Sequence, residues 1–208
     1  MLYGYPGSGK TYFARQFCEQ VQAAHVQGDR IRSELFEHPS YDKEENKVVT
    51  QLMDYMTSEF LSVGISVVYD TNSARAIQRH GLREMARKIG VKPLLLWFQI
   101  DTDSGYYRSS KRDRRRLDDK FSAPLDRAMY QKLTGQMQNP VMTEDYTVVS
   151  GKHTFNTQYA AVSHKLREIG LYGIDAGNAH VVKPGMVNLI PSKQVGRVDM
   201  SRRNITIR

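Results

Sequence analysis

Gly4-Tyr5-Pro6-Gly7-Ser8-Gly9-Lys10-Thr11 is the stretch that decides the fold, because it has the G-x-x-x-x-G-K-[ST] spacing of a phosphate-binding loop. Its glycines let successive backbone N–H groups converge on one anion, since no Cβ blocks positive φ or close approach. Lys10 supplies a positive charge for the β- and γ-phosphates, and Thr11 supplies a hydroxyl for Mg²⁺. The loop therefore predicts a nucleotide site formed by Gly4 through Thr11, with Tyr12 beside it.

The residues on either side of the loop test this interpretation, because a phosphate-binding loop follows a strand and opens a helix. Apolar residues recur after the loop at the spacing of one helical face, namely Phe13, Ala14, Phe17, Cys18 and Val21. Only Met1-Leu2-Tyr3 precede Gly4, which is short for a buried strand of about 5 residues. A nucleotide site is favoured over a chance match in a glycine-rich turn, and Cys18 is expected to be a core thiol.

Composition limits the classes of protein that fit. The chain has 208 residues, of which 40% are hydrophobic, and it carries one cysteine and a net charge of +8. One cysteine excludes an internal disulfide framework, and the absence of a leader and of a long apolar run predicts a cytoplasmic chain without a membrane partner. The positive charge suits an anionic partner. The six histidines lack metal-ligand spacing and are expected to be ordinary surface or boundary residues.

Strand and helix patterns alternate along the chain, which predicts an α/β fold of the three-layer P-loop NTPase type. About five parallel strands are expected, at 1–3, 23–27, 65–69, 93–100 and 147–149, with helices on both faces of the sheet. Helices are expected at 47–61, 74–89, 124–137 and 158–169, and the arginine-rich segment 106–117 is expected in a helical lid. We expect one phosphate-loop domain over 1–170 and a basic appendage over 171–208, with short strands at Met186–Ile190 and Asn204–Ile207 or partial disorder.

Asp29 and Arg32 follow the second expected strand, at the sheet edge where parallel α/β folds keep their chemistry. A carboxylate there can orient an acceptor hydroxyl and take its proton, so Asp29 is the candidate general base. Arg32 lies three residues on and can hold a phosphate or carboxylate of the acceptor. The alternative is equally compatible with the spacing: Asp29 caps the helix, and Arg32 makes a surface ion pair.

Two further signals follow later strands. Asp70 ends the third strand and can hold Mg²⁺ through water, although an Asx-turn would use the same residue. The stretch from Arg108 to Arg116 has six positive charges and one negative charge. On a helix, Arg108, Arg112 and Arg115 would share a face and could close over a triphosphate as a lid, covering about residues 104–122. A solvated basic helix or a nucleic-acid contact are the alternatives, with Arg114 and Arg116 facing outward.

These motifs in this order resemble the polynucleotide 5′-hydroxyl kinase family of P-loop kinases, within a wider group of AAA-type ATP-binding kinases that includes the zeta-toxin-like kinases. The resemblance covers about residues 1–150 and rests on the phosphate loop, Asp29-x-x-Arg32, Asp70-Thr71-Asn72 and Arg108-x-x-Lys111-Arg112, followed by the similar segment Pro124 to Tyr130. It departs from the family at Arg30, where members often have a second aspartate, and in the tail beyond residue 170.

The resemblance implies an ATP- and Mg²⁺-dependent kinase. Lys10, Asp29, Arg32 and Arg112 would be catalytic, and Arg108, Arg112 and Arg115 would bind ATP together with the loop. Mg²⁺ would be bound by Thr11 and, through water, by Asp70, which would also support Arg32. The acceptor would be bound by Arg32, Asp70 and Asn72. The 5′-hydroxyl of a polynucleotide is the first acceptor to consider. A sugar or nucleotide-sugar kinase and a non-catalytic nucleotide-binding module are the alternatives.

Overall fold

The fold is that of a computed structural model, which describes residues 1–117 and 119–171. Five strands occur in this part of the chain: β1 (Leu2–Gly4), β2 (Ala24–Gln27), β3 (Val67–Asp70), β4 (Leu95–Gln99) and β5 (Tyr146–Ser150). Its helices are α1 (Lys10–Val21), α2 (Gly28–Leu35), α3 (Lys43–Ser62), α4 (Ala76–Ile89), α5 (Thr102–Ser110), α6 (Arg127–Gly135) and α7 (Phe155–Glu168). The strands expected at Met186–Ile190 and Asn204–Ile207, and the appendage apart from Leu171, lie outside the described residues.

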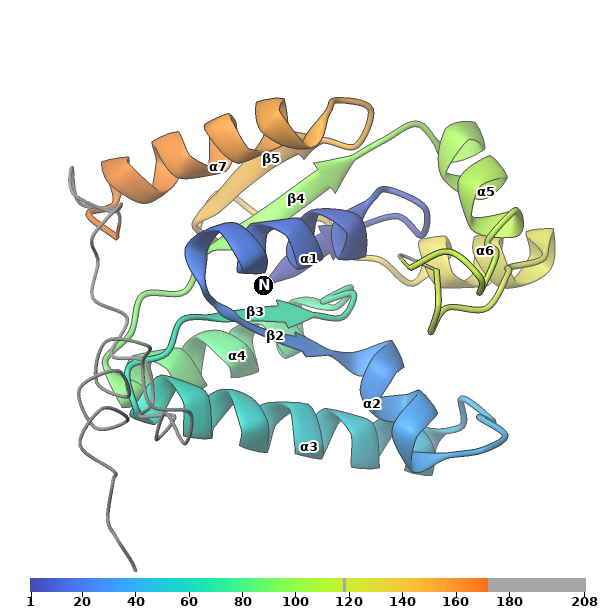
Figure 1. The fold of residues 1–208 in the computed structure, drawn as a ribbon, viewed down its shortest axis with the longest axis horizontal. Coiled ribbons are helices and arrows are strands. Elements are labelled where there is room, and N and C mark those ends of the chain that lie inside the picture. The colour runs from blue at the N-terminus through green and yellow to red at the C-terminus, as the bar shows by residue number, and fades with distance from the viewer. Residues whose placement is uncertain (118, 172–208) are drawn as a thin grey trace, which may run out of the picture. The chain divides into compact units, whose positions relative to one another are not determined.

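All strand pairs are parallel. β1 pairs with β4, β4 pairs with β5, and β2 pairs with β3. A bridge between Leu2 and Asn72 joins the two groups, which gives the order β2-β3-β1-β4-β5 across the sheet. The expected five-stranded parallel α/β fold is confirmed. All the carboxyl ends of the strands therefore meet at one edge of the sheet, where α5 and α6 lie in Figure 1.

Helices cover both faces of the sheet (Figure 1). On one face, α1 and α7 pack on a core that includes Phe13, Phe98 and Phe155. On the other face, α3 packs against β2 and β3 through a second core of Val26, Ile31, Val49, Met53 and Tyr69. Cys18 is buried in the first core, as expected. The three residues of β1 are fully enclosed because the strand has a neighbour on each side, which is how so short a strand holds its place.

The helical lid expected over about residues 104–122 is helical only as far as Ser110, where α5 ends. Side chains compete with the helical hydrogen bonds in the next segment: Asp113 Oδ1 accepts from the backbone N–H of Arg115 at 3.0 Å, and Asp119 Oδ2 accepts from that of Asp113 at 3.3 Å. The following helix starts at Arg127 instead of Pro124, because Asp126 caps it by accepting from the N–H of Met129 at 2.7 Å. The segment expected to form the lid is therefore the end of α5 followed by an irregular stretch that leads to α6.

Candidate functional site

The loop between β1 and α1 has the backbone that its glycines predict. Gly7 has φ 78° and Gly9 has φ 90°, both in the left-handed region. A Cβ at Gly7 would lie 2.2 Å from the carbonyl oxygen of Gly105 in α5, so only glycine fits there. A Cβ at Gly9 would meet nothing within 4 Å. The loop is thus packed against α5 at Gly7 and open at Gly9, on the side where a ligand would enter.

Backbone donors face this open side. Ser8 N–H donates to the carbonyl of Tyr5 at 3.1 Å and closes the loop. Among the described residues, the N–H groups of Gly7, Gly9, Lys10 and Thr11 have no acceptor in the loop or in a neighbouring turn. These donors lie at the N-terminus of α1, where the helix dipole favours negative charge. The arrangement fits a di- or triphosphate.

Lys10 is folded back onto the loop. Its Nζ donates to the carbonyls of Gly4 at 2.7 Å and Tyr5 at 2.9 Å. Burial lowers the pKa of Lys10 to about 8, and the nearby Asp70 carboxylate offsets part of that effect. The ammonium thus has weak neutral acceptors that a phosphate would replace.

Thr11 and Asp70 meet as the sequence predicts for a Mg²⁺ site. Thr11 Oγ1 donates to Asp70 Oδ1 at 3.3 Å, and Asp70 is 5% exposed at the end of β3. A hydroxyl and a carboxylate are suitable oxygen ligands for Mg²⁺, directly or through water. His25 of β2 also contacts Asp70, with 2.9 Å between Nε2 and Oδ2. This histidine was expected to be an ordinary surface or boundary residue; its side chain is 20% exposed, as at a boundary, but its contact with Asp70 was not anticipated. The signal was its place on β2, the strand that pairs with β3.

Asp29 lies in the first turn of α2, and the N-cap of that helix is Gln27. The alternative in which Asp29 caps the helix is therefore wrong. Its Oδ2 accepts a hydrogen bond at 2.9 Å from the hydroxyl of Ser122 in the lid. Burial raises the pKa of Asp29, whereas the Ser122 hydrogen bond and the Arg112 charge act in the opposite direction. A carboxylate with a raised pKa is a suitable proton acceptor.

Arg32 is held by the start of α3. Its guanidinium forms a buried ion pair with Glu45 and donates to Asn46 Oδ1 at 2.6 Å. The Arg32 guanidinium also lies 4.6 Å from the ring centre of Tyr41. The expected surface ion pair is wrong because the pair is buried, and the partner of Arg32 is Glu45 instead of Asp70. Binding of an acceptor by Arg32 stays a prediction.

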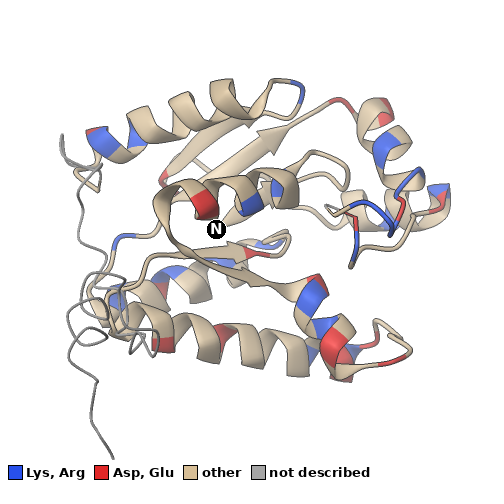
Figure 2. Ribbon diagram, viewed as in Figure 1, with Lys and Arg blue, Asp and Glu red and all other residues tan. Residues whose placement is uncertain are grey.

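The three lid arginines do not share a helix face, since only Arg108 lies on α5. Arg108 donates to the carbonyl of Gly151 at 2.7 Å, and Arg112 donates to that of Ala123 at 3.0 Å. Arg115 is exposed and pairs with Asp113 at 3.1 Å. Figure 2 shows that basic residues gather in this segment, at the carboxyl edge of the sheet. Their role at a triphosphate stays a prediction.

Asn72 supports the loop in this structure. Its Oδ1 accepts from the N–H of Gly4 at 3.3 Å, and its Nδ2 approaches Met137 Sδ at 3.8 Å. The side chain thus joins the end of β1 to the segment after α6. Tyr12 is 40% exposed on α1.

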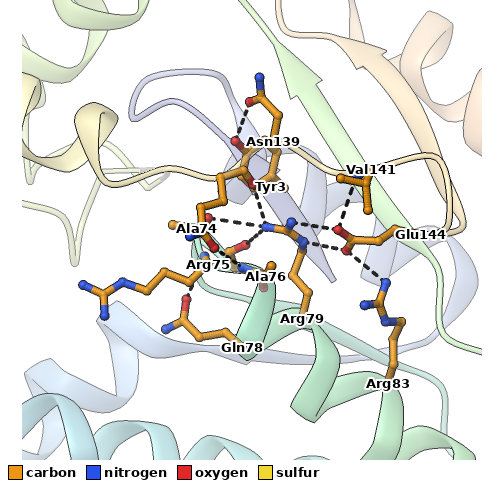
Figure 3. A network of polar contacts seen from close by, with 12 residues as sticks. Tyr3, Ala74, Arg75, Ala76, Gln78, Arg79, Arg83, Asn139, Val141 and Glu144 are labelled. Carbon is orange, nitrogen blue, oxygen red and sulfur yellow. Dashed lines mark hydrogen bonds and ion pairs between the residues drawn. The ribbon is translucent and has the colours of Figure 1, made fainter.

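A buried ion pair that the sequence reasoning missed lies below β1 (Figure 3). Arg79 of α4 is 0% exposed and makes two hydrogen bonds to Glu144, at 2.7 and 2.8 Å. It also donates to the carbonyls of Ser73 and Gln138, and its guanidinium lies 5.2 Å from the ring centre of Tyr3. A nearby cavity of about 440 Å³ is lined by Tyr3 of β1, Trp97 of β4 and Asn139 after α6, together with Tyr5 of the phosphate loop, Asp101 before α5 and Lys152 after β5.

Comparisons with known proteins agree with this geometry. Residues 1–136 match the sequence model of a family described as AAA domain. No curated protein matches the sequence. Within residues 1–117 and 119–171, no helix has the length and apolar character that crossing a membrane requires.

Several solved structures share the fold. A gluconokinase from Sinorhizobium meliloti 1021 superposes with a TM-score of 0.57 and 15% identity, over 81% of this chain and 90% of that one. A sugar kinase from Janibacter sp. HTCC2649 superposes with a TM-score of 0.56 and 14% identity, over 82% of this chain and 94% of that one. Kti12 from Chaetomium thermophilum, in complex with ADP-AlF3, superposes with a TM-score of 0.56 and 16% identity, over 77% of this chain and 97% of that one. At these identities the likeness establishes the P-loop kinase-like fold.

Proposed function

The chain belongs to the AAA domain family, and from that premise we propose that it is an ATP-dependent phosphotransferase with a hydroxyl group as acceptor. The observation that carries the proposal is the placement of Asp29. Its partly buried carboxylate, with a raised pKa, lies close enough to Lys10 and Arg112 for the three charges to influence one another. A carboxylate suited to accept a proton near the loop lysine supports a phosphotransferase over a module that only binds nucleotide.

Each residue has a distinct task in the proposed reaction. The loop N–H groups and Lys10 hold the β- and γ-phosphates, and Arg112 with Arg108 neutralises charge that develops on the transferring phosphoryl group. Asp29 aligns the acceptor hydroxyl and takes its proton as the new O–P bond forms. Thr11 and Asp70 would hold Mg²⁺, directly or through water, and the ion would supply positive charge that reduces the repulsion between the phosphates and the incoming oxygen.

Two acceptor classes have support. The 5′-hydroxyl of a polynucleotide is favoured by the order of the sequence motifs and by the exposed Arg114, Arg115 and Arg116 in the lid. A sugar is favoured by the shared fold of the gluconokinase and the sugar kinase. The salt dependence of acceptor affinity distinguishes the two classes. Contacts with several phosphates release counterions, so the affinity for a polynucleotide should fall steeply as the salt concentration rises, whereas the affinity for a neutral sugar should not.

The test is transfer of label from γ-labelled ATP in Mg²⁺ to a panel of 5′-hydroxyl oligonucleotides, sugars, nucleosides and nucleotide-sugars. We expect Lys10→Ala to lose both ATP affinity and transfer. Asp29→Ala should keep ATP affinity and lose transfer by about 10²- to 10⁴-fold, the usual contribution of a general base. Glu34→Ala is the matched control, because Glu34 is an exposed acid on the same helix α2.

Two outcomes would contradict the proposal. If Asp29→Ala transferred phosphoryl at the wild-type rate, Asp29 would not be the base. If the protein bound ATP but released no ADP with any acceptor in the panel, and Asp29→Ala changed nothing, a nucleotide-dependent switch module would be the better description.

A further inference from the structure

Ser122 is the lid residue that touches the proposed base. Its Oγ donates to Asp29 Oδ2 at 2.9 Å, across 93 positions of sequence. The serine is only 6% exposed, so this contact is enclosed by protein. A hydroxyl therefore already occupies the position relative to Asp29 that an acceptor hydroxyl must take during phosphoryl transfer.

The surroundings of this hydroxyl are those of an acceptor site. Arg112 donates to the carbonyl of Ala123, the residue after Ser122, at 3.0 Å. The charges of Asp29 and Arg112 both act on the Lys10 ammonium. Ser122 thus contacts the group that would take a proton, and the residue after it contacts Arg112, the cation that would stabilise a transferring phosphoryl group.

The backbone holds Ser122 in this place. Its N–H donates to the carbonyl of Asp119 at 3.0 Å, which closes a turn of the lid. Leu125 N–H donates to the carbonyl of Ser109 at 3.1 Å, and this bond ties the next part of the segment to α5. A positioned nucleophile gains rate because its orientation is fixed before the reaction.

We propose that Ser122 is an autophosphorylation site, at which the protein transfers the γ-phosphoryl of ATP to its own lid when no external acceptor is bound. This inference rests on the proposed function. The Ser122 oxygen forms a bond to the γ-phosphorus, the bond from that phosphorus to the β–γ bridging oxygen breaks, ADP leaves, and the hydroxyl proton passes to Asp29. The products are ADP and a phosphoserine beside Asp29.

The modification has a consequence for the site. A phosphoserine carries about 1.5 to 2 negative charges at neutral pH and would repel the carboxylate of Asp29. Arg112, which contacts the carbonyl of Ala123, offers a cation for that phosphate. The phosphorylated lid would therefore leave Asp29, and the acceptor position would change from occupied by Ser122 to open.

The experiment incubates the full-length protein with γ-labelled ATP and Mg²⁺ without acceptor and locates the label by peptide mass spectrometry. We expect one phosphoryl per chain at Ser122, at a rate per protein that does not change over a hundredfold range of protein concentration. Ser122→Ala should lose the label. Ser122→Thr should keep it as phosphothreonine, which separates chemistry at this position from damage to the fold.

Two variants define the mechanism. Asp29→Asn keeps the size of the side chain but cannot take the proton, so labelling should fall at least 100-fold. Ser110→Ala is the matched control, because Ser110 lies at the end of α5 and its hydroxyl donates to the carbonyl of Tyr107 instead. This variant should be labelled as the wild type is.

The same samples, assayed for transfer to the acceptor panel, distinguish the two ways of failing. Transfer to an external acceptor without label on Ser122 would overturn this inference and leave the proposed function intact. ATP binding with neither labelling nor transfer would overturn both. Label on another residue, or a labelling rate per protein that rises with protein concentration, would also refute reaction within one chain at Ser122.

Discussion

Glu144→Gln tests how the strand that carries the phosphate loop is supported. The substitution keeps the shape of the side chain and removes the charge that neutralises Arg79 (Figure 3). Arg79 is 0% exposed, and the Glu144 side chain is 3% exposed, so solvent cannot replace the lost carboxylate. Removing one partner of such a pair costs about 3–5 kcal/mol, because the other charge stays buried without compensation.

We expect the lower end of that range. The glutamine oxygen can still accept one hydrogen bond, and the guanidinium keeps its bonds to the carbonyls of Ser73 and Gln138. A loss of about 3 kcal/mol is a large part of the roughly 5–15 kcal/mol that stabilises a folded domain. For a domain of this size it corresponds to a fall in Tm of about 6–12 °C.

The assay is urea unfolding followed by circular dichroism, with Glu84→Gln as the control. Glu84 pairs with Arg87 on the surface of α4, where the Arg87 side chain is 77% exposed. Such pairs contribute about 0–1 kcal/mol. If Glu144→Gln destabilised the protein no more than Glu84→Gln does, Arg79 would have another source of compensation and the network would not support β1.

The contribution of Glu144 should also depend on pH. The hydrogen bonds and charge of Arg79 hold the pKa of Glu144 below its ordinary value of 4.5. Because the pKa of Glu144 is lower in the folded protein than in the unfolded chain, its stabilising effect is complete at pH values above the pKa of the unfolded chain. The effect is lost as the pH falls through the pKa of the folded protein. The difference in stability between wild type and Glu144→Gln should therefore be constant from neutral pH to about 5 and shrink in acid.

Three further predictions concern the loop and its helix. Gly7→Ala should lower the free energy of unfolding by more than about 1 kcal/mol and weaken ATP binding, because the new Cβ would meet the Gly105 carbonyl at a residue with positive φ. Gly81→Ala in α4, the control, should be neutral or stabilising. Urea unfolding measures the stability of both variants, and calorimetry measures their ATP binding. ATP affinity should fall as pH rises through about 8, because burial lowers the pKa of Lys10 to that value and only the ammonium attracts phosphate; a Kd independent of pH from 7 to 9 would refute this. Cys18 should resist a disulfide reagent such as dithionitrobenzoate until the protein unfolds, because burial raises its pKa to about 12.

Local patterns made most of the fold predictable. The apolar spacing in α1 and the leucine and aromatic run in β4 identify their elements because each element buries one face or both. The expected end of the lid helix was wrong because the competing hydrogen bonds come from Asp113 and Asp119, and helical spacing contains no information about such bonds. Helix starts were displaced for the same reason at Asp126.

The site was predictable to the extent that its residues follow strands. Thr11 and Asp70 meet because the carboxyl ends of β1 and β3 share one edge of the sheet, which the parallel topology already requires. The partners of Arg32 and Arg79 were not predictable, since Glu45 and Glu144 occur in segments whose position depends on loop geometry. Sequence spacing identified Asp29 and Asp70, which follow or end strands, and missed Glu45 at the start of α3 and Glu144 just before β5.

The contact between Ser122 and Asp29 connects the choice of acceptor to the lid. A hydrogen bond to a charged group contributes about 1.5–3 kcal/mol, so an external hydroxyl that displaces Ser122 loses about a factor of 10 to 150 in apparent affinity. An acceptor recovers that loss only through contacts elsewhere, and two sources are available beside Asp29. A polyanion can bind the exposed arginines of the lid at positions 114–116, and a small acceptor can use the buried Arg32 with the exposed ring of Tyr41 beside it. Salt screens contacts with the exposed arginines but has little effect on contacts with a buried side chain. The salt dependence of transfer therefore shows which of these contacts the acceptor uses to displace Ser122.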